Sequence, residues 1–274
     1  MGLRIQNNVA ALNSYNNVNR TDKAVSSSLE KLSSGYRINK AADDAAGLVV
    51  SEGLRSQIGG LTVAARNAQD GVNVAQTADG ALSTVTDILQ RMRDLAVQAS
   101  SDGSQDSEAQ AAANKEFSAL KSEIDRIGSS TKFGSKALLD GTYTGTFQVG
   151  ANNATDNRIS VHIFNVASLS ASLTTSLTNT SDAQTAIDDI DKVLKQVTGA
   201  RADLGAVQNR FEHAINNINT SIENITASES AIRDTDMAKE MTKFTKNQIL
   251  SQAGTSMLAQ ANSSSQNILS LLRG

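Results

Sequence analysis

Residues 54–96 read LRSQIGGLTVAARNAQDGVNVAQTADGALSTVTDILQRMRDLA, and apolar residues recur along them at alternating steps of four and three. The stripe consists of Leu54, Ile58, Leu61, Ala65, Ala68, Val72, Ala75, Leu82 and Leu89, with polar Asp79 in its path. A period of 3.5 predicts a supercoiled helix, and a run longer than about 25 residues favours a coiled coil over an ordinary globular helix. At ~1.5 Å per residue the stretch would form a rod about 60 Å long.

The same pattern recurs in the second half of the chain, again with one polar interruption, at Glu229. Its apolar members are Phe211, Ile215, Ile218, Ile222, Ile225 and Ile232. Shorter stretches with helical spacing cover residues 117–127 and 187–197. The sequence therefore predicts helical segments on both sides of a short middle region.

That middle region has the composition of strands and turns. Residues 146–149 and 158–163 are typical of two short strands, and the turn-rich residues 150–157 lie between them. This arrangement predicts a small β-hairpin. The Ser/Thr-rich residues 169–182 are interpreted as a loop or the tip of a hairpin.

Composition supports long, narrow helical packing. The chain has 274 residues, of which 39% are hydrophobic but only 3% aromatic, and it contains neither proline nor cysteine. Scarce aromatic residues favour thin helix–helix seams over wide cores. Proline would cost about 3 kcal/mol inside a helix, so its absence suits long rods. Without cysteine, disulfides and thiolate chemistry are excluded.

The two ends of the chain are expected to pack on several sides. The C-terminal apolar residues are Leu250, Met257, Ala261, Ile268 and Leu272, and the surrounding polar residues are mostly Ser, Gln and Asn. A charged face suits water, whereas small uncharged side chains let helices approach closely. We therefore favour packing in an assembly over the alternative of an ordinary exposed helix.

Signatures of catalysis and of metal binding are missing from the sequence. The two histidines, His162 and His213, stand in unrelated segments, and neither belongs to an H-E-x-x-H pattern. The pair Gly59-Gly60 lacks the Lys-Ser/Thr ending of a phosphate loop and is interpreted as a close helix contact. No catalytic residue, metal or cofactor is expected, and the chain is predicted not to be an enzyme.

The acidic pairs, the net charge and the hydropathy of the chain likewise give no sign of a metal, nucleic-acid or membrane site. Asp43-Asp44 and Asp188-Asp189 are interpreted as favourable charges near helix N-termini. The formal net charge is −3 with both signs interleaved, which disfavours nucleic acid. No apolar run approaches the roughly 20 residues that span a bilayer, and residues 1–15 do not resemble a cleaved secretory signal. Export, if it occurs, is expected to use another route.

Two long motifs resemble a known family. Residues 33–48, SSGYRINKAADDAAGL, resemble the N-terminal signature of bacterial flagellins. Residues 236–273 look like the matching C-terminal signature, through DMAKE, QIL, MLAQAN and QNILSLLR. Together with the rods between them, the resemblance covers nearly the whole chain.

The resemblance implies a mainly α fold with long antiparallel helical rods, a coiled coil of the N- and C-terminal segments and a small β-hairpin in the middle. The domains it implies are two parts of an inner coiled coil, at 1–42 and 236–274, and a rod domain with its N-terminal helices at 43–132 and its C-terminal helix at 183–235. Residues 133–182 would form a short β-hairpin and loop region in place of a large outer domain.

In function, the resemblance implies a secreted, extracellular subunit that polymerises into the filament of the bacterial flagellum for motility, its ends folding as they pack. The residues expected at the assembly interface are Ile5, Val9, Leu12, Leu250, Met257, Ala261, Ile268 and Leu272. Implied partners are identical subunits, a flagellar export chaperone, and the filament cap and hook-associated junction proteins. Neither nucleic acid nor membrane is among them.

Residues 89–98, LQRMRDLAVQ, also look like the family segment recognised by the vertebrate Toll-like flagellin receptor. The possible contacts by this similarity are Gln90, Arg91, Leu95, Gln98 and Glu116, with packing between subunits as the alternative.

Three rival functions and one departure from the family pattern remain. The nearest rival is a hook–filament junction protein with similar ends, followed by a cytoplasmic signalling coiled coil, and an enzyme is the most distant. Ser265 stands where the family often has proline, so a fixed bend at that point is in doubt.

Overall fold

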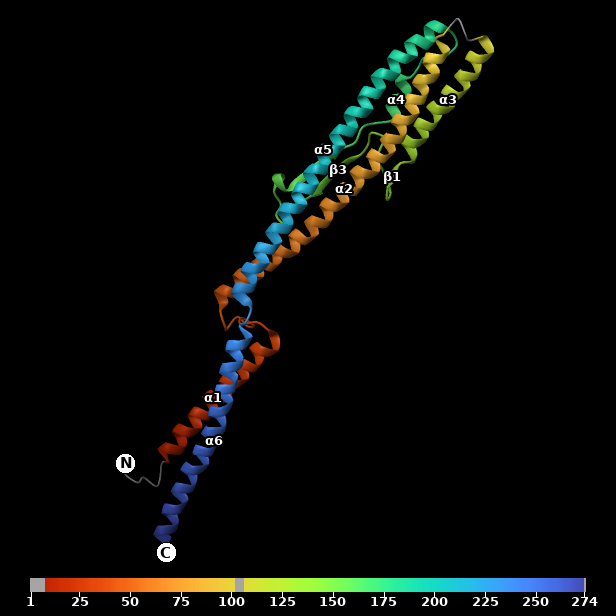
Figure 1. Cartoon of the computed structure of the whole chain (residues 1–274). Coiled ribbons are helices and arrows are strands. Elements are labelled where there is room, and N and C mark those ends of the chain that lie inside the picture. The colour runs from red at the N-terminus through yellow and green to blue at the C-terminus, as the bar shows by residue number, and fades with distance from the viewer. Residues whose placement is uncertain (1–7, 102–105, 274) are drawn as a thin grey trace. The chain divides into compact units, whose positions relative to one another are not determined.

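The computed structural model describes residues 8–101 and 106–273, with side chains as far as residue 264. It divides into two compact units. We call residues 1–56 with 225–274 the terminal unit, and residues 57–224 the central unit. Two long helices, α2 (Ala45–Ala99) and α5 (Thr180–Arg233), contribute residues to both units (Figure 1).

In the central unit α2 and α5 lie side by side and run antiparallel. Arg93 pairs with Asp191, and Arg201 pairs with Asp79, each with a nitrogen–oxygen distance of 2.8 Å. The described part of this unit also contains helix α3 (Ser107–Ser130), the short α4 (Ala167–Ser172) and a single 3-10 turn, η1 (Thr155–Asn157). The predicted class, mainly α with long antiparallel rods, is confirmed.

The core of the central unit is large and apolar. It contains 33 buried residues, and its largest fully buried side chains include Phe211, Leu82, Leu89, Met92, Ile124, Ile190 and Leu204. Gly71 leaves the room that the Phe211 ring occupies, because a Cβ there would lie 2.4 Å from its Cζ. The same ring meets Phe147 edge to face, with centroids 5.4 Å apart.

The polar interruption of the first stripe has a partner. Asp79 accepts a hydrogen bond from Nε of Arg201 on α5. Both side chains are about one-third exposed, at 35% and 34%, so the pair lies at the rim of the seam. Asp79 therefore breaks the apolar pattern without leaving a buried charge unpaired.

The β structure consists of two antiparallel pairs. Strand β3 (Thr144–Gln148) pairs with β4 (Arg158–His162) in the register Thr144 to His162, which confirms the predicted hairpin to within two residues. A smaller pair, β1 (Lys132–Phe133) with β2 (Lys136–Ala137), was not predicted. The loop after β3 packs on α2, since a Cβ at Gly60 would lie 2.9 Å from that of Ala151. Gly60 thus makes the predicted close contact, but with a loop rather than a helix.

Two expectations for the second half of the chain were wrong. The expected loop 169–182 contains the end of α4 and the first residues of α5, which continues through both apolar stripes, at 187–197 and 211–232. Asp188 and Asp189 lie in the third turn of α5, too far from its N-terminus for the proposed charge effect. Asp189 instead pairs with Lys192 at 3.0 Å.

The terminal unit is built on α1 (Val9–Ser34) and α6 (Met237–Arg273), which lie side by side (Figure 1). The side chain of Asn8 caps α1 by accepting the N–H of Ala11, and Asp236 does the same for α6 through Lys239. Gly35 ends α1 with φ of +76°, a conformation that favours glycine. The predicted pairing of the two chain ends is confirmed.

Candidate assembly interface

The seam between α1 and α6 follows a heptad pattern on both helices. The buried and half-buried positions recur at steps of three and four, and small side chains predominate among them. They are Ala11, Ser14, Val18, Thr21, Val25, Ser28 and Leu32 on α1, and Glu240, Phe244, Asn247, Ser251, Gly254, Leu258 and Ala261 on α6. The two helices approach closely at Gly254, where a Cβ would lie 2.8 Å from Cγ2 of Val18.

Hydrogen bonds from side chains cross this seam at three places in the described part of the chain. The Ser28 hydroxyl donates to Glu240 at 2.7 Å, the Ser251 hydroxyl donates to Asp22 at 2.7 Å, and Nδ2 of Asn8 donates to the carbonyl of Ala261 at 3.0 Å. The closer a bonded residue lies to the start of α1, the closer its partner lies to the end of α6. The two helices therefore run antiparallel in a single register.

The terminal unit buries very little apolar surface of its own. Among its described side chains only six residues are buried: Val18, Ile38, Ser28, Ser51, Arg233 and Glu240. Two of these are apolar and four are polar or charged. Such a seam cannot supply the burial on which the stability of an ordinary helical bundle rests.

The large apolar side chains of this unit face outward instead. Of the 14 large hydrophobic side chains that are exposed in the described part of the chain, 11 belong to the terminal unit. They are Val9, Leu12, Tyr15, Leu29, Val49, Val50, Met237, Met241, Ile249, Leu250 and Met257. Soluble monomers rarely concentrate exposed apolar residues in this way, so the pattern marks an interaction surface.

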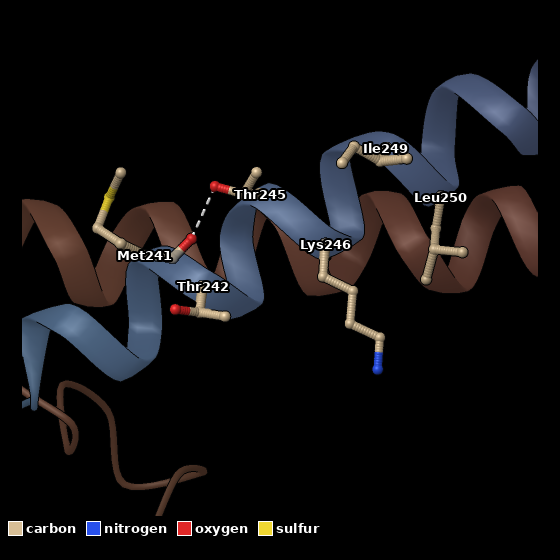
Figure 2. Close-up of a pocket in the computed structure, with 6 residues that line it drawn as sticks. All are labelled: Met241, Thr242, Thr245, Lys246, Ile249 and Leu250. Atoms are coloured by element: carbon tan, nitrogen blue, oxygen red, sulfur yellow. Dashed lines mark hydrogen bonds between the residues drawn. The ribbon is translucent and has the colours of Figure 1, made fainter.

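Part of this surface is a shallow groove on α6 (Figure 2), lined by Met241, Thr242, Thr245, Lys246, Ile249 and Leu250. Both threonine hydroxyls donate to carbonyls of their own helix, Thr242 to Ala238 and Thr245 to Met241. Their hydrogen-bonding capacity is used locally, which leaves the methyl groups to the groove. The groove is therefore apolar apart from the Lys246 ammonium.

The N-terminal signature forms the junction between α1 and the end of α5. Tyr36 makes a β-bridge with Asp234, and the guanidinium of Arg233 lies 4.8 Å from the centre of the Tyr36 ring. Arg233, itself 9% exposed, also donates to Glu52 at 2.6 Å. This bond lowers the pKa of Glu52, because the guanidinium stabilises the carboxylate.

The rest of the signature closes the loop before α2. Asp44 caps α2 by accepting the N–H of Gly47, which confirms the helix N-terminal interpretation for this residue. Asp43 instead accepts the N–H groups of Asn39 and Lys40, and these bonds lower its pKa. Ile38 is completely buried beside Gly47, where a Cβ would lie 2.7 Å from its Cδ1.

The predicted assembly residues fall into three groups. Val9, Leu12, Leu250 and Met257 are exposed, by 54%, 60%, 47% and 63%. Ala261 lies in the seam and accepts the bond from Asn8. Ile5 lies outside the described residues, and Ile268 and Leu272 belong to α6 although their side chains lie outside the described part.

Four of the five possible receptor contacts are exposed. Arg91 on α2 and Glu116 on α3 form an ion pair at 2.8 Å, and Gln90 and Gln98 also face solvent. Leu95 is only 3% exposed and packs in the core of the central unit. The structure thus brings Arg91 and Glu116 together, leaves Gln90 and Gln98 exposed on α2, and buries Leu95.

Sequence reasoning missed the buried polar residues described in the terminal unit, Ser28, Ser51, Arg233 and Glu240. The signal for Glu240 was its place in the heptad series that continues through Phe244 and Asn247, where a charge is unusual. Its pKa is lowered, chiefly by the Ser28 hydroxyl and then by Lys243 and Lys31. The carboxylate is therefore ionised at neutral pH although the residue is 6% exposed.

Within the described residues there is no group of three metal-ligating side chains, and no helix is long and apolar enough to cross a membrane. Both histidines are exposed and lie on separate elements, His162 at the end of β4 and His213 on α5.

Comparison with known proteins covers both halves of the chain. Residues 5–144 match the family description "Bacterial flagellin N-terminal helical region", and residues 187–272 match "Bacterial flagellin C-terminal helical region". A flagellin of Bacillus subtilis is 47% identical, over 99% of this chain and 100% of its own length. A flagellin of Halalkalibacterium halodurans is 48% identical, over 98% and 99% respectively.

Solved structures agree on the fold. The crystal structure of Bacillus cereus flagellin has a TM-score of 0.52 at 31% identity, and covers 60% of this chain and 94% of that one. A putative flagellar hook-associated protein from Vibrio parahaemolyticus has a TM-score of 0.59 at 13% identity, with 70% and 100% covered. At that low identity the second likeness concerns the fold alone.

Proposed function

Because the chain belongs to the bacterial flagellin family, we propose that the exposed apolar faces of α1 and α6 are the surfaces through which its copies pack in the flagellar filament. Flagellins are the structural subunits of that filament and assemble with copies of themselves. The matches to the two flagellins named above span nearly the whole length of each. The likeness to the hook-associated protein concerns the fold alone. The filament subunit is therefore the function of this chain.

The distribution of apolar residues carries the proposal. The seam uses small and polar side chains, while Leu12 on α1 and Ile249, Leu250 and Met257 on α6 remain between 47% and 63% exposed. Burying a large apolar side chain contributes about 1.5–3 kcal/mol. Further copies are the partners that suit these faces, because subunits of one kind present the same helices side by side in a helical polymer.

We also propose that the ends of the chain complete their folding during assembly. Ordering a residue costs about 1–2 kcal/mol of conformational entropy, and the six buried residues of the terminal unit offset little of it. Docking onto neighbouring copies adds the missing burial. Folding of the ends and polymerisation are then one coupled step.

The test replaces exposed apolar residues by glutamine: Leu12→Gln, Met257→Gln and the two together. Seeded growth is followed by sedimentation and electron microscopy. Each single variant should raise the subunit concentration needed for growth about 10- to 100-fold, since about 1.5–3 kcal/mol is lost per residue and each 1.4 kcal/mol is tenfold.

The matched control is Val63→Gln, because Val63 is an exposed apolar residue of the central unit, at 45%. It should change growth less than either terminal variant does. Normal growth of the Leu12 and Met257 variants, or a larger effect at Val63, would contradict the assignment of the interface to α1 and α6.

The exposed apolar face of α6 is also the surface to which we assign the export and capping partners. We propose that the chain is secreted through the flagellar export apparatus, and that a chaperone covers the apolar face of α6 before assembly. The same face would meet the filament cap and the hook-associated junction proteins at the two ends of the filament. The groove formed by Met241, Ile249 and Leu250 supports these proposals, since exposed apolar residues need cover before assembly.

Recognition by a vertebrate Toll-like receptor remains a proposal for the central unit. The exposed polar residues Gln90, Arg91, Gln98 and Glu116 support a contact there, with Arg91 and Glu116 already paired. Buried Leu95 would act by holding α2 in place. Receptor activation by an Arg91→Ala variant, compared with Arg66→Ala on the same helix, tests this proposal.

A further inference from the structure

The seam between α1 and α6 offers few features that fix how far one helix slides along the other. Its α1 side contains Ala11, Ser14 and Thr21, and its α6 side contains Ser251, Gly254 and Ala261. Side chains of similar small size give similar packing at neighbouring alignments. Apolar contacts alone therefore discriminate poorly between registers, and a polar contact can decide between them.

Glu240 is the charged residue among the seam positions named above. It is 6% exposed, and its carboxylate accepts the Ser28 hydroxyl at 2.7 Å, with Ser28 itself 4% exposed. Lys243, one turn along the same helix, lies 3.0 Å away. The neighbouring seam positions on α1 are Val25 and Leu32, neither of which can donate a hydrogen bond.

A shift of α6 by three or four residues would place the carboxylate against one of these aliphatic side chains. Lys243 would move with the carboxylate on α6, but the loss of the Ser28 donor at a buried site should still outweigh the differences in packing between small residues. The β-bridge of Tyr36 with Asp234 acts in the same direction at the end of the seam, but it involves no side chain of α1 or α6.

We propose that the buried Ser28–Glu240 hydrogen bond determines the register of α1 on α6, and thereby the relative position of the apolar residues that neighbouring copies contact. Leu29 and Met241 illustrate the consequence. Each directly follows a member of the bonded pair and each is exposed, by 56% and 49%. A slip of three or four residues would move them about 5 Å relative to each other. The inference rests on the proposed docking of copies through these helices.

The exposed bond between Ser251 and Asp22 provides a matched comparison. It joins the same chemical groups across the same seam at the same 2.7 Å, but it is exposed to water. Water can replace a lost partner there, so removing this bond should leave the register unchanged.

Disulfide cross-linking in assembled filaments measures the register, because the chain has no cysteine of its own. A Cβ at residue 254 would lie 3.9 Å from the Cβ of Val18, within the range of about 3.5–4.5 Å typical of disulfides. The pair V18C with G254C reports the observed register. The pairs V18C with S251C and V18C with L258C report shifts of three or four residues. Cross-links within a chain and between chains are separated by size on a denaturing gel.

Each pair is combined with Glu240→Leu or Ser28→Ala, and with Asp22→Ala as the control, because alanine removes the acceptor for Ser251. In the parent and in Asp22→Ala, only the pair at 254 should cross-link. Glu240→Leu and Ser28→Ala should spread the cross-links to 251 or 258, and Glu240→Gln, which keeps an acceptor for Ser28, should restore the parent pattern. Failure of Glu240→Leu and Ser28→Ala to assemble, while Asp22→Ala still does, also fits a register that docking requires.

Filaments of Glu240→Leu and Ser28→Ala that cross-link only at 254 would overturn the inference, as would parent filaments that do not cross-link at 254. Failure of the proposed function gives a different result. In that case Leu12→Gln and Met257→Gln grow normally, whatever the register.

Discussion

The two units of this chain bury opposite kinds of residues with the same helical geometry. The central unit encloses 33 residues in an apolar core, with Phe211, Leu82 and Leu89 completely buried. The terminal unit buries six of its described side chains, four of them polar, and exposes 11 large apolar ones. A heptad stripe is therefore not enough to show whether a helix packs within its own subunit or against another.

This contrast separates stability from assembly. A core such as that of the central unit is sufficient to hold a domain together, whereas the terminal unit holds its apolar surface ready for other chains. Substitutions in the central unit should accordingly change the free energy of unfolding of the lone subunit. Substitutions in the terminal unit should instead change filament growth. The predictions below test that separation.

The largest effect on the lone subunit is expected from Phe211→Ala. The ring is fully buried against Gly71 and Phe147, so its loss should lower the free energy of unfolding by about 3–5 kcal/mol. Urea denaturation of the soluble subunit, followed by circular dichroism, measures the change.

Leu12→Ala is the control for this prediction, because Leu12 is 60% exposed. It should change the unfolding transition by less than about 0.5 kcal/mol. A loss at Leu12 comparable with that at Phe211 would mean that the terminal unit is already packed in the lone subunit, contrary to the contrast drawn above.

Smaller effects on the lone subunit are expected when either of two glycines on α2, Gly71 and Gly80, is replaced by alanine. At Gly71 an added Cβ would clash with the Phe211 ring, whereas at Gly80 nothing lies within 4 Å. Gly80→Ala should stabilise the subunit by about 0.5–1 kcal/mol through helix propensity. Gly71→Ala gains the same propensity but should lose about 1–3 kcal/mol to overpacking.

Thermal unfolding of the two variants gives the comparison directly. Gly80→Ala should raise the midpoint and Gly71→Ala should lower it. Equal stabilisation by both would show that α2 and α5 do not approach as closely at Gly71 as the structure indicates.

The sequence predicted the features that depend on local pattern. The stripe from Leu54 to Leu89 lies within α2, the hairpin appears with strands at 144–148 and 158–162, and the two chain ends pair. Periodicity, turn residues and the family motifs sufficed for these features, because each is a property of one segment or of a signature.

The sequence could not predict which face of each terminal helix is buried. The sequence assigned the apolar series through Leu250 and Met257 to the assembly interface, and both side chains are exposed. Nothing in that series indicated that the seam with α1 uses Ser251 and Gly254. Small residues give a weak signal because they fit a buried seam as well as an exposed surface. The Ser28–Glu240 bond was missed for a related reason: its partners are 212 positions apart, and a Glu on a helix is normally read as solvated.

The smallest predicted effect is a pH dependence of the terminal pair. The Ser28 hydroxyl, together with Lys243 and Lys31, lowers the pKa of Glu240 from its ordinary value of 4.5. A lowered pKa in the folded state means that the carboxylate stabilises the pair above about pH 4.5, and that this contribution is lost as the pH falls through the lowered value. Acid should therefore loosen α1 from α6, and Glu240→Gln should weaken the pair at pH 7 while flattening its response to acid between pH 5 and 3. Amide exchange of filaments, read in α1 and α6, measures both changes.

Glu123→Gln is the control, since the pKa of Glu123 is also lowered, by Arg126, but on the exposed surface of α3. If that variant altered exchange in α1 and α6 as much as Glu240→Gln does, the acid response would come from the general charge of the subunit and not from the buried seam.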